Sequence, residues 1–130
     1  MIAVDALENA VKQLRGGMAV AEAASFDDLY RDGVIQRFEY TMDLSWKLLR
    51  RVLFQSFDVQ ESDLRSKKDI FREAARVSLI TDAERWIGHY EARNQTSHDY
   101  NQDKADRVFQ QAKLFLEDVQ DLLGVLRHVP

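Results

Sequence analysis

The sequence has no cysteine, a single proline at its last position and only five glycines among 130 residues. Without cysteine the chain can form no disulfide, and its three scattered histidines show no zinc-ligand spacing. Because proline and glycine are so scarce, almost nothing in the interior of the sequence prevents long helices. We therefore expect a helical protein without a structural metal.

Long apolar runs are also missing. No stretch approaches the roughly 20 residues that cross a bilayer, and the first five residues lack the basic and apolar regions of a signal peptide. We therefore expect a protein without a membrane span that resides in the cytoplasm. The net charge of −4 argues against a general preference for nucleic acid, so any RNA chemistry must depend on a local site.

The composition predicts one folded domain. Apolar residues make up 45% of the chain and charged residues 31%, which is enough to fill one core and to cover a solvated surface. Two separate cores in a chain of this length would each be too small to be stable. We expect residues 1–130 to form a single domain.

The apolar pattern of the first half predicts two helices. Residues 2–15 place apolar side chains three and four positions apart, which is typical of an amphipathic helix. Gly16-Gly17 follows, and the helix either continues through this weak point or restarts after a kink. Residues 25–32 form a polar connection, and the next apolar stripe predicts the longest helix, which runs to about Phe54. The stripe consists of Val34, Ile35, Phe38, Met42, Ser45, Leu49 and Val52.

Two capping patterns predict the next helices. Ser66 and Asp69 have the spacing of an N-cap pair, and they open a short helix that ends near Val77. Thr81 and Glu84 have the spacing of a capping box, in which a hydroxyl and a carboxylate each satisfy a free backbone amide. This box opens a fourth helix.

The fourth helix runs into residues 93–94 and is followed by a loop over residues 95–102. Asp103 then caps a last helix, whose apolar positions keep helical spacing as far as Leu126. No part of the sequence requires a strand. Because short connections join long amphipathic helices, we predict an all-α fold, an antiparallel up-down bundle of four to five helices.

The segment from Arg93 to Tyr100 gathers a cation, an imidazole and a phenol within eight residues. Residues five apart on a helix are rotated by about 140°, so Arg93 and His98 converge only where the helix ends or bends. An imidazole can move a proton to or from a ribose hydroxyl while a guanidinium holds the phosphate, which is metal-independent RNA cleavage. Two proton-transfer groups are needed, and a symmetric dimer would supply the second histidine.

A purely structural interpretation of the same segment is also open. A histidine at a helix end often bonds to the backbone, and Arg93 can pair with a nearby carboxylate such as Glu91 or Asp99. The residues of this segment do not decide by themselves between the structural and the chemical interpretation.

Four side chains on the long helix form a strip beside its apolar stripe. Glu39, Asp43, Trp46 and Arg50 are separated by four, three and four positions, which keeps them within about 60° of one another. The strip is either a solvated flank with internal ion pairs or a surface that supports a dimer contact or an active site. Together with Lys47, Arg50 also provides local positive charge for a bound phosphate.

The other histidines and two aromatic residues show no pattern of a site. We expect His89 and His128 to face solvent. Trp86 and Tyr90 are at helical spacing, and we expect them in the core or in an interface.

Most of the chain, roughly residues 32–126, resembles the HEPN fold and, within it, the nucleotidyltransferase substrate-binding proteins that accompany minimal nucleotidyltransferases. Three pieces carry the resemblance, in the family's order: the segment from Arg31 to Tyr40 that leads to Trp46-Lys47, the segment Ile70-Phe71-Arg72-Glu73-Ala74, and the segment from Arg93 to Tyr100. The last piece contains the family's complete motif of Arg, four residues, His, one residue and Tyr.

This resemblance implies a toxin-antitoxin pair. The present chain would be a homodimeric, RNase-like toxin, and a minimal nucleotidyltransferase would be its antitoxin. Carried over to this sequence, Arg93 and His98 would be catalytic, with Asn94 orienting them, and Tyr100 would be adenylylated by the partner. The chain itself would need no cofactor, because ATP and magnesium would be used by the nucleotidyltransferase.

A second function remains open. The chain could instead be a non-catalytic accessory subunit that presents a substrate or a nucleotide to a nucleotidyltransferase. The complete pair of Arg93 and His98 favours the ribonuclease, whereas the acidic net charge favours the accessory subunit.

Overall fold

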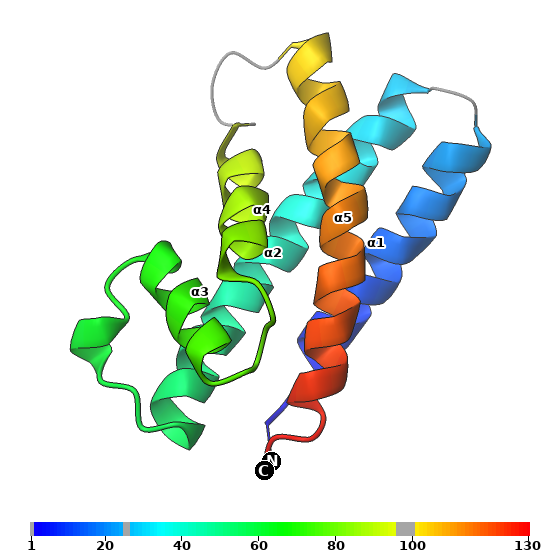
Figure 1. Ribbon diagram of the computed structural model, residues 1–130. Coiled ribbons are helices and arrows are strands. Elements are labelled where there is room, and N and C mark those ends of the chain that lie inside the picture. Colours follow the sequence, from blue (N-terminus) through cyan, green and yellow to red (C-terminus); the bar gives the residue numbers. More distant parts are fainter. Residues whose placement is uncertain (1, 25–26, 96–100) are drawn as a thin grey trace.

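The computed structural model describes residues 2–24, 27–95 and 101–130. These residues form five α-helices and one short 3-10 helix, without a strand (Figure 1). The elements are α1 (Asp5–Ala23), α2 (Asp28–Ser56), η1 (Glu61–Asp63), α3 (Lys67–Arg76), α4 (Ala83–Gln95) and α5 (Gln102–Leu126).

The four long helices α1, α2, α4 and α5 alternate in direction along the chain (Figure 1). α1 and α2 form one hairpin and α4 and α5 run in opposite directions, while the long helix α2 crosses the bundle and contacts every other α-helix (Figure 1). The shorter α3 packs against α2 and α4 at one end of the bundle. This arrangement confirms the predicted all-α helical bundle. The helix α2 is the one against which all the other α-helices pack.

Aromatic rings fill the centre of the core. Phe38 of α2 meets Phe115 of α5 edge to face, with ring centroids 5.1 Å apart. Trp86 of α4 packs on the same Phe115 ring at 5.5 Å. All three side chains are buried, in agreement with the predicted core position of Trp86. Edge-to-face pairs add about 0.5–1.5 kcal/mol beyond the burial of their area, so this cluster fixes α2, α4 and α5 relative to one another.

α1 runs without a break through Gly16-Gly17. Gly17 serves the packing against α2, because a Cβ atom there would lie only 2.8 Å from Nη1 of Arg37. The guanidinium of Arg37 crosses over Gly17 and donates to the carbonyl oxygen of Gln13 at 2.8 Å. The pair of glycines therefore leaves room for a side chain from the neighbouring helix.

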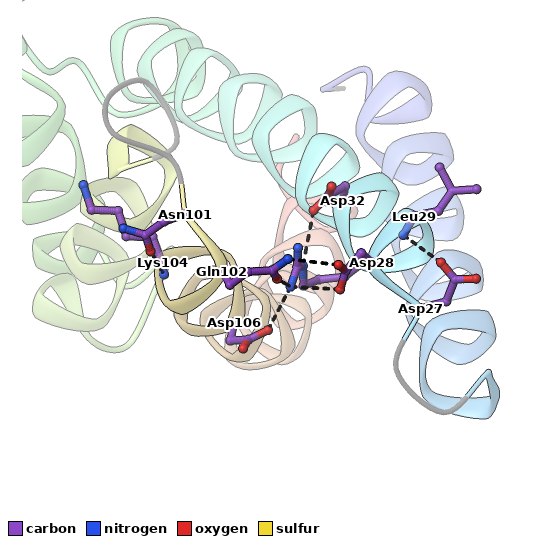
Figure 2. Close-up of polar contacts among 9 residues, drawn as sticks. Asp27, Asp28, Leu29, Asp32, Asn101, Gln102, Lys104 and Asp106 are labelled. Carbon is purple, nitrogen blue, oxygen red and sulfur yellow. Dashed lines mark hydrogen bonds and ion pairs between the residues drawn. The ribbon is translucent and has the colours of Figure 1, made fainter.

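α2 begins earlier than the sequence pattern predicts. The predicted connection over residues 25–32 is wrong from Asp28 onwards, because Asp28 is already the first residue of α2. Asp27 is its N-cap, and the carboxylate of Asp27 accepts a hydrogen bond from the backbone amide of Leu29 at 2.8 Å (Figure 2). The prediction missed this start because Asp28, Tyr30 and Asp32 are exposed in the first turns of the helix and look like a polar connection.

The predicted cap of α3 is confirmed, and two other predicted caps are wrong. Ser66 accepts a hydrogen bond from the backbone amide of Asp69 at 3.1 Å. At α4, the predicted box of Thr81 and Glu84 is replaced by Asp82, whose carboxylate accepts from the amide of Arg85 at 3.1 Å. The N-cap of α5 is Asn101 rather than Asp103, with its side chain accepting from the amide of Lys104 at 2.9 Å.

His89 does not face solvent, which corrects the prediction. Its side chain is buried beside Phe115, and Nε2 lies 2.6 Å from a carboxylate oxygen of Asp118. The side-chain amide nitrogen of Gln111 lies 2.8 Å from Nδ1. These contacts fit a neutral ring that donates from Nε2 and accepts at Nδ1. His128, by contrast, is exposed as predicted.

Within the described residues, no helix is long and apolar enough to cross a membrane.

Candidate functional site

Arg93 lies in the last turn of α4 and is bound by two carboxylates of α2. Its Nε and Nη2 each donate to one oxygen of Asp43 at 3.2 Å, and its Nη1 donates to Glu39 at 2.8 Å. Glu39 and Asp43 are one turn apart on α2, so both face the end of α4. The side-by-side bonds to Asp43 fix the plane of the guanidinium as well as its position.

The ion pairs are only partly shielded from water. The side chain of Arg93 is 24% exposed, and those of Glu39 and Asp43 are 26% and 35% exposed. The hydrogen bond to Asp43 raises the pKa of Arg93, and burial opposes this effect. Arg93 is therefore a permanently charged cation at the rim of the bundle, held in place by the carboxylates of Asp43 and Glu39.

Of the two nearby carboxylates considered from the sequence, Glu91 pairs with a different cation, and Asp99 is not described. Glu91 lies 4.0 Å from the ammonium of Lys68 on α3, and Asp99 lies outside the described residues. The carboxylates that bind Arg93 come from positions about fifty residues earlier in the chain. Glu39 and Asp43 were placed on one strip from the sequence, but their contact with Arg93 depends on how α4 packs on α2.

The remaining predicted site residues divide into two groups. Asn94 is exposed next to Arg93 at the end of α4, while His98 and Tyr100 lie outside the described residues. Lys47 and Arg50 do not join the site of Arg93. Lys47 lies 5.6 Å from the centre of the Trp46 ring, and Arg50 forms a long ion pair of 3.8 Å with Glu61 of η1.

A second arginine fixes the start of α5, and the sequence pattern did not single it out as a site residue. Arg31 of α2 is 8% exposed, and its Nη1 donates to both Gln102 and Asp106 of α5 (Figure 2). Its Nε donates to Asp32, and Asp28 lies 3.3 Å from Nη1. Burial lowers the pKa of Arg31, and its carboxylate partners more than offset this effect, so that the pKa is raised.

The two arginine clusters bracket one segment of the chain. Arg93 ties the end of α4 to α2, and Arg31 of α2 ties down the start of α5. Between these two points the chain passes through residues 96–100, which include His98 and Tyr100. Both ends of the segment with the remaining predicted site residues are therefore fixed to the same helix, α2.

The described residues contain no group of three or more His, Asp or Glu side chains that could hold a metal ion. The carboxylates beside Arg93 and Arg31 are engaged in ion pairs with the guanidinium groups. In the described part of the chain, these ion pairs hold the two guanidinium groups in place.

Solved structures with the same fold define the class of the protein. One from Haemophilus influenzae, described as the fold of a substrate binding domain of a nucleotidyltransferase, superposes with a TM-score of 0.85 and 30% identity, covering 97% of this chain and 100% of that one. A structure from Thermus thermophilus superposes with a TM-score of 0.79 and 30% identity, covering 94% and 99% of the two chains. The chain is thus built as a nucleotidyltransferase substrate-binding bundle.

The chain belongs to the nucleotidyltransferase substrate binding protein like family, whose sequence model matches residues 3–128. This match confirms the resemblance seen in the sequence. A Haemophilus influenzae relative with the name Probable ribonuclease HepT is 41% identical over 96 residues, which is 73% of this chain. The aligned part is 66% of that relative's length, just under two thirds.

Proposed function

We propose that this chain is the RNA-cleaving toxin of a pair whose antitoxin is a minimal nucleotidyltransferase, and that it acts in the cytoplasm. The observation that carries the proposal is the fixed guanidinium of Arg93, held by Asp43 and Glu39 just ahead of the segment with His98 and Tyr100. The name of the ribonuclease relative supports the same activity.

In this proposal Arg93 holds the scissile phosphate. Three hydrogen bonds join the guanidinium to Asp43 and Glu39. They set its plane before RNA arrives, so little side-chain entropy is lost on binding. Negative charge that develops on the phosphate oxygens is then met by a cation whose position is already set.

His98 supplies the proton transfer, and Asn94 orients the groups around it. One imidazole removes the proton of the ribose 2′-hydroxyl, whose oxygen attacks the adjacent phosphorus and displaces the 5′-oxygen. A second imidazole, from the other protomer of a homodimer, protonates that leaving oxygen. The products are a 2′,3′-cyclic phosphate and a 5′-hydroxyl, and no metal is needed.

The antitoxin acts on Tyr100. The phenol oxygen attacks the α-phosphate of ATP, pyrophosphate leaves, and AMP remains attached to the tyrosine. The magnesium and the carboxylates for this transfer belong to the nucleotidyltransferase. Because Tyr100 is two positions from His98, the attached AMP adds negative charge and bulk where RNA must bind.

The charge balance around Arg93 favours a second candidate function. Arg93 faces two carboxylates, so the three side chains together carry a charge of −1, which weakens the attraction for phosphate. An accessory subunit that presents a substrate to a nucleotidyltransferase needs no phosphate clamp at this position. A cleavage experiment separates the two functions.

The cleavage experiment uses purified chain and a labelled single-stranded RNA. The wild type should cleave the RNA, and His98→Ala should lower the rate at least about 100-fold, since general acid-base catalysis contributes that much or more. Arg93→Lys should also be impaired, because an ammonium cannot reproduce the planar fork. His128→Ala is the matched control, since His128 is exposed near the C-terminus and should leave the rate unchanged. Wild-type protein that leaves RNA intact would support the accessory subunit.

The neutralisation step is tested by mass spectrometry. After incubation with the partner nucleotidyltransferase, ATP and magnesium, the peptide with Tyr100 should gain the mass of AMP and cleavage should stop. Tyr100→Phe should gain no mass and stay active in the presence of the partner. Tyr40→Phe is the control, because Tyr40 is 60% exposed on α2 and outside the motif. An unmodified Tyr100 in the wild type would refute this part of the proposal.

A further inference from the structure

An open groove lies between α2 and the start of α3, apart from the bonds that hold Arg93. Its volume is about 740 Å³, which is in the range of sites that bind small ligands. The side chains that line it come from the second half of α2, from η1 and the following turn, and from the first residues of α3. They include Trp46, Arg50, Glu61, Arg65, Ser66 and Lys67.

The charge of the groove is opposite to that of the whole chain. Its lining contains the three cations Arg50, Arg65 and Lys67 and the single carboxylate Glu61, a net charge of +2, whereas the chain carries −4. The nearest atoms of Glu61 and Arg50 are 3.8 Å apart, and the two side chains are 67% and 42% exposed. Such exposed ion pairs are weak, so an entering anion can replace this one at little cost. The groove is therefore a locally positive surface on an acidic protein.

Trp46 gives the groove an aromatic surface. Its side chain is partly buried against the core, and its ring lies in the lining of the groove. The ammonium of Lys67 lies 4.4 Å from the ring centre, and that of Lys47 lies 5.6 Å from it. Both ammonium groups lie over the indole, so a base that stacks on Trp46 would replace the ammonium of Lys67, which would then be close enough to bind the adjoining phosphate.

The groove continues the strip of α2 that holds Arg93. Trp46 follows Asp43 by three residues, a rise of about 4.5 Å along the helix. Asp43 binds Arg93, so the bound cation and the indole are neighbours on one helix face. Lys68 of α3 and Glu91 of α4 lie 4.0 Å apart, which places the start of α3 beside the end of α4.

We propose that this groove binds the single-stranded RNA next to the cleaved bond, with one base stacked on Trp46 and the adjoining phosphates held by Arg65 and Lys67. The inference rests on the proposed ribonuclease function and assigns its substrate path. A base and its phosphate could also come from a free nucleotide. RNA is favoured because the lining carries a net positive charge, and because Trp46 follows Asp43, which holds Arg93, by three residues on α2.

The test measures binding without cleavage. Full-length His98→Ala protein is titrated with a fluorescein-labelled single-stranded RNA of about ten nucleotides, at several salt concentrations. In this background Trp46→Leu should weaken binding about tenfold, in line with the loss of one stacked base. The double variant Arg65→Gln/Lys67→Gln should also bind more weakly, and its plot of log affinity against log salt should flatten by about 0.7 per phosphate contact.

A matched double variant controls for the change in net charge. Lys12→Gln/Arg127→Gln also removes two positive charges, and both residues pair with Glu8, outside the lining of the groove. It should bind RNA as the His98→Ala parent does. RNA should also quench the fluorescence of Trp46 but not that of the buried Trp86, so the quenching should disappear in Trp46→Leu. Thermal unfolding of each variant verifies that the bundle is intact.

Three results would overturn the proposal. Equal RNA affinity of the groove variants and the control variant would show that RNA does not use the groove. Competition by AMP or ATP at the same concentration as the oligonucleotide would show a mononucleotide site. Loss of nucleotidyltransferase binding with unchanged RNA affinity would show a protein contact. The binding assay uses His98→Ala and does not depend on cleavage. If the wild type fails to cleave RNA, the ribonuclease function is refuted, and the binding assay still shows whether RNA uses the groove.

Discussion

Asp43 binds the guanidinium of Arg93 side on, through two hydrogen bonds of 3.2 Å each, across the contact of α2 with α4. A single bond would leave the guanidinium free to rotate, whereas two parallel bonds fix its plane. Glu39 adds a third bond from the neighbouring turn of α2. The end of α4 is therefore positioned by an ion pair that also orients the group proposed to hold phosphate.

Asp43→Asn tests this orienting role. The amide offers one acceptor oxygen instead of two, so Arg93 should keep the bond to Glu39 and lose its fixed plane. Cleavage of RNA should fall about 10- to 100-fold, because small displacements of a positioned group have effects of this size. The loss should appear mainly in kcat, while stability changes by about 1 kcal/mol. Asp121→Asn, an exposed change on α5, is the control, and equal rates for both variants would contradict the role.

Arg31→Met should destabilise the bundle. The buried guanidinium of Arg31 bonds Asp106 and Gln102 of α5, and its removal leaves three carboxylates without their shared cation. We expect a loss of about 2–3 kcal/mol in the free energy of unfolding, measured with urea. Arg107→Met on the exposed side of α5 should change it by less than about 0.5 kcal/mol. Equal losses would show that the Arg31 cluster does not anchor α5.

The protein should become less stable in mild acid because His89 is buried. Burial lowers the pKa of His89 in the folded protein, and the carboxylate of Asp118 opposes this only in part. Below the ordinary value of about 6.5 the unfolded chain therefore binds a proton that the folded chain does not. The free energy of unfolding is therefore highest above about pH 6.5. It declines as the pH falls below this value, with a limiting slope of about 1.4 kcal/mol per pH unit.

Urea unfolding at pH 7.5, 6.5 and 5.5 checks this prediction. His89→Gln should be less stable than the wild type at pH 7.5, because the bonds to Asp118 and Gln111 are lost or weakened. Its stability should change less between pH 6.5 and 5.5. His128→Gln, at an exposed position, should keep the wild-type dependence. A His89→Gln variant with the full wild-type slope would assign the dependence to other groups.

The glycine pair of α1 offers a matched comparison. A Cβ at Gly16 meets nothing within 4 Å, so Gly16→Ala should stabilise the protein by about 0.5–1 kcal/mol. A Cβ at Gly17 would lie 2.8 Å from Nη1 and 3.3 Å from Cδ of Arg37, so Gly17→Ala should gain less or lose stability. Thermal unfolding of the two variants measures the difference. Equal gains would show that Arg37 moves aside at no cost.

The helices could be predicted from the sequence because their signals are local. The apolar spacing of α1, α2 and α5 follows from positions three and four apart, and the hydroxyl of Ser66 caps α3 as predicted. The other helix starts were missed by one or a few residues where several capping side chains compete. At α4, Thr81 and Asp82 both fit an N-cap, and at α5 both Asn101 and Asp103 do.

The contacts between helices could not be predicted in the same way. The strip of Glu39 and Asp43 was visible on α2, but nothing local shows that α4 places Arg93 against it. The burial of His89 could not be predicted for the same reason. As a polar residue it was expected at the surface, but its partners Asp118 and Gln111 come from α5. Long-range polar pairs depend on packing geometry, which hydrophobic spacing does not encode.

The chemical ends of the RNA products decide whether Arg93 and His98 cleave RNA. The wild-type chain should cleave single-stranded RNA in the presence of EDTA, and mass spectrometry should find 2′,3′-cyclic phosphate and 5′-hydroxyl ends, since the proposed chemistry of these two residues needs no metal. These ends should be absent with His98→Ala. Intact RNA, or ends that form equally with His98→Ala, would contradict the proposed ribonuclease function.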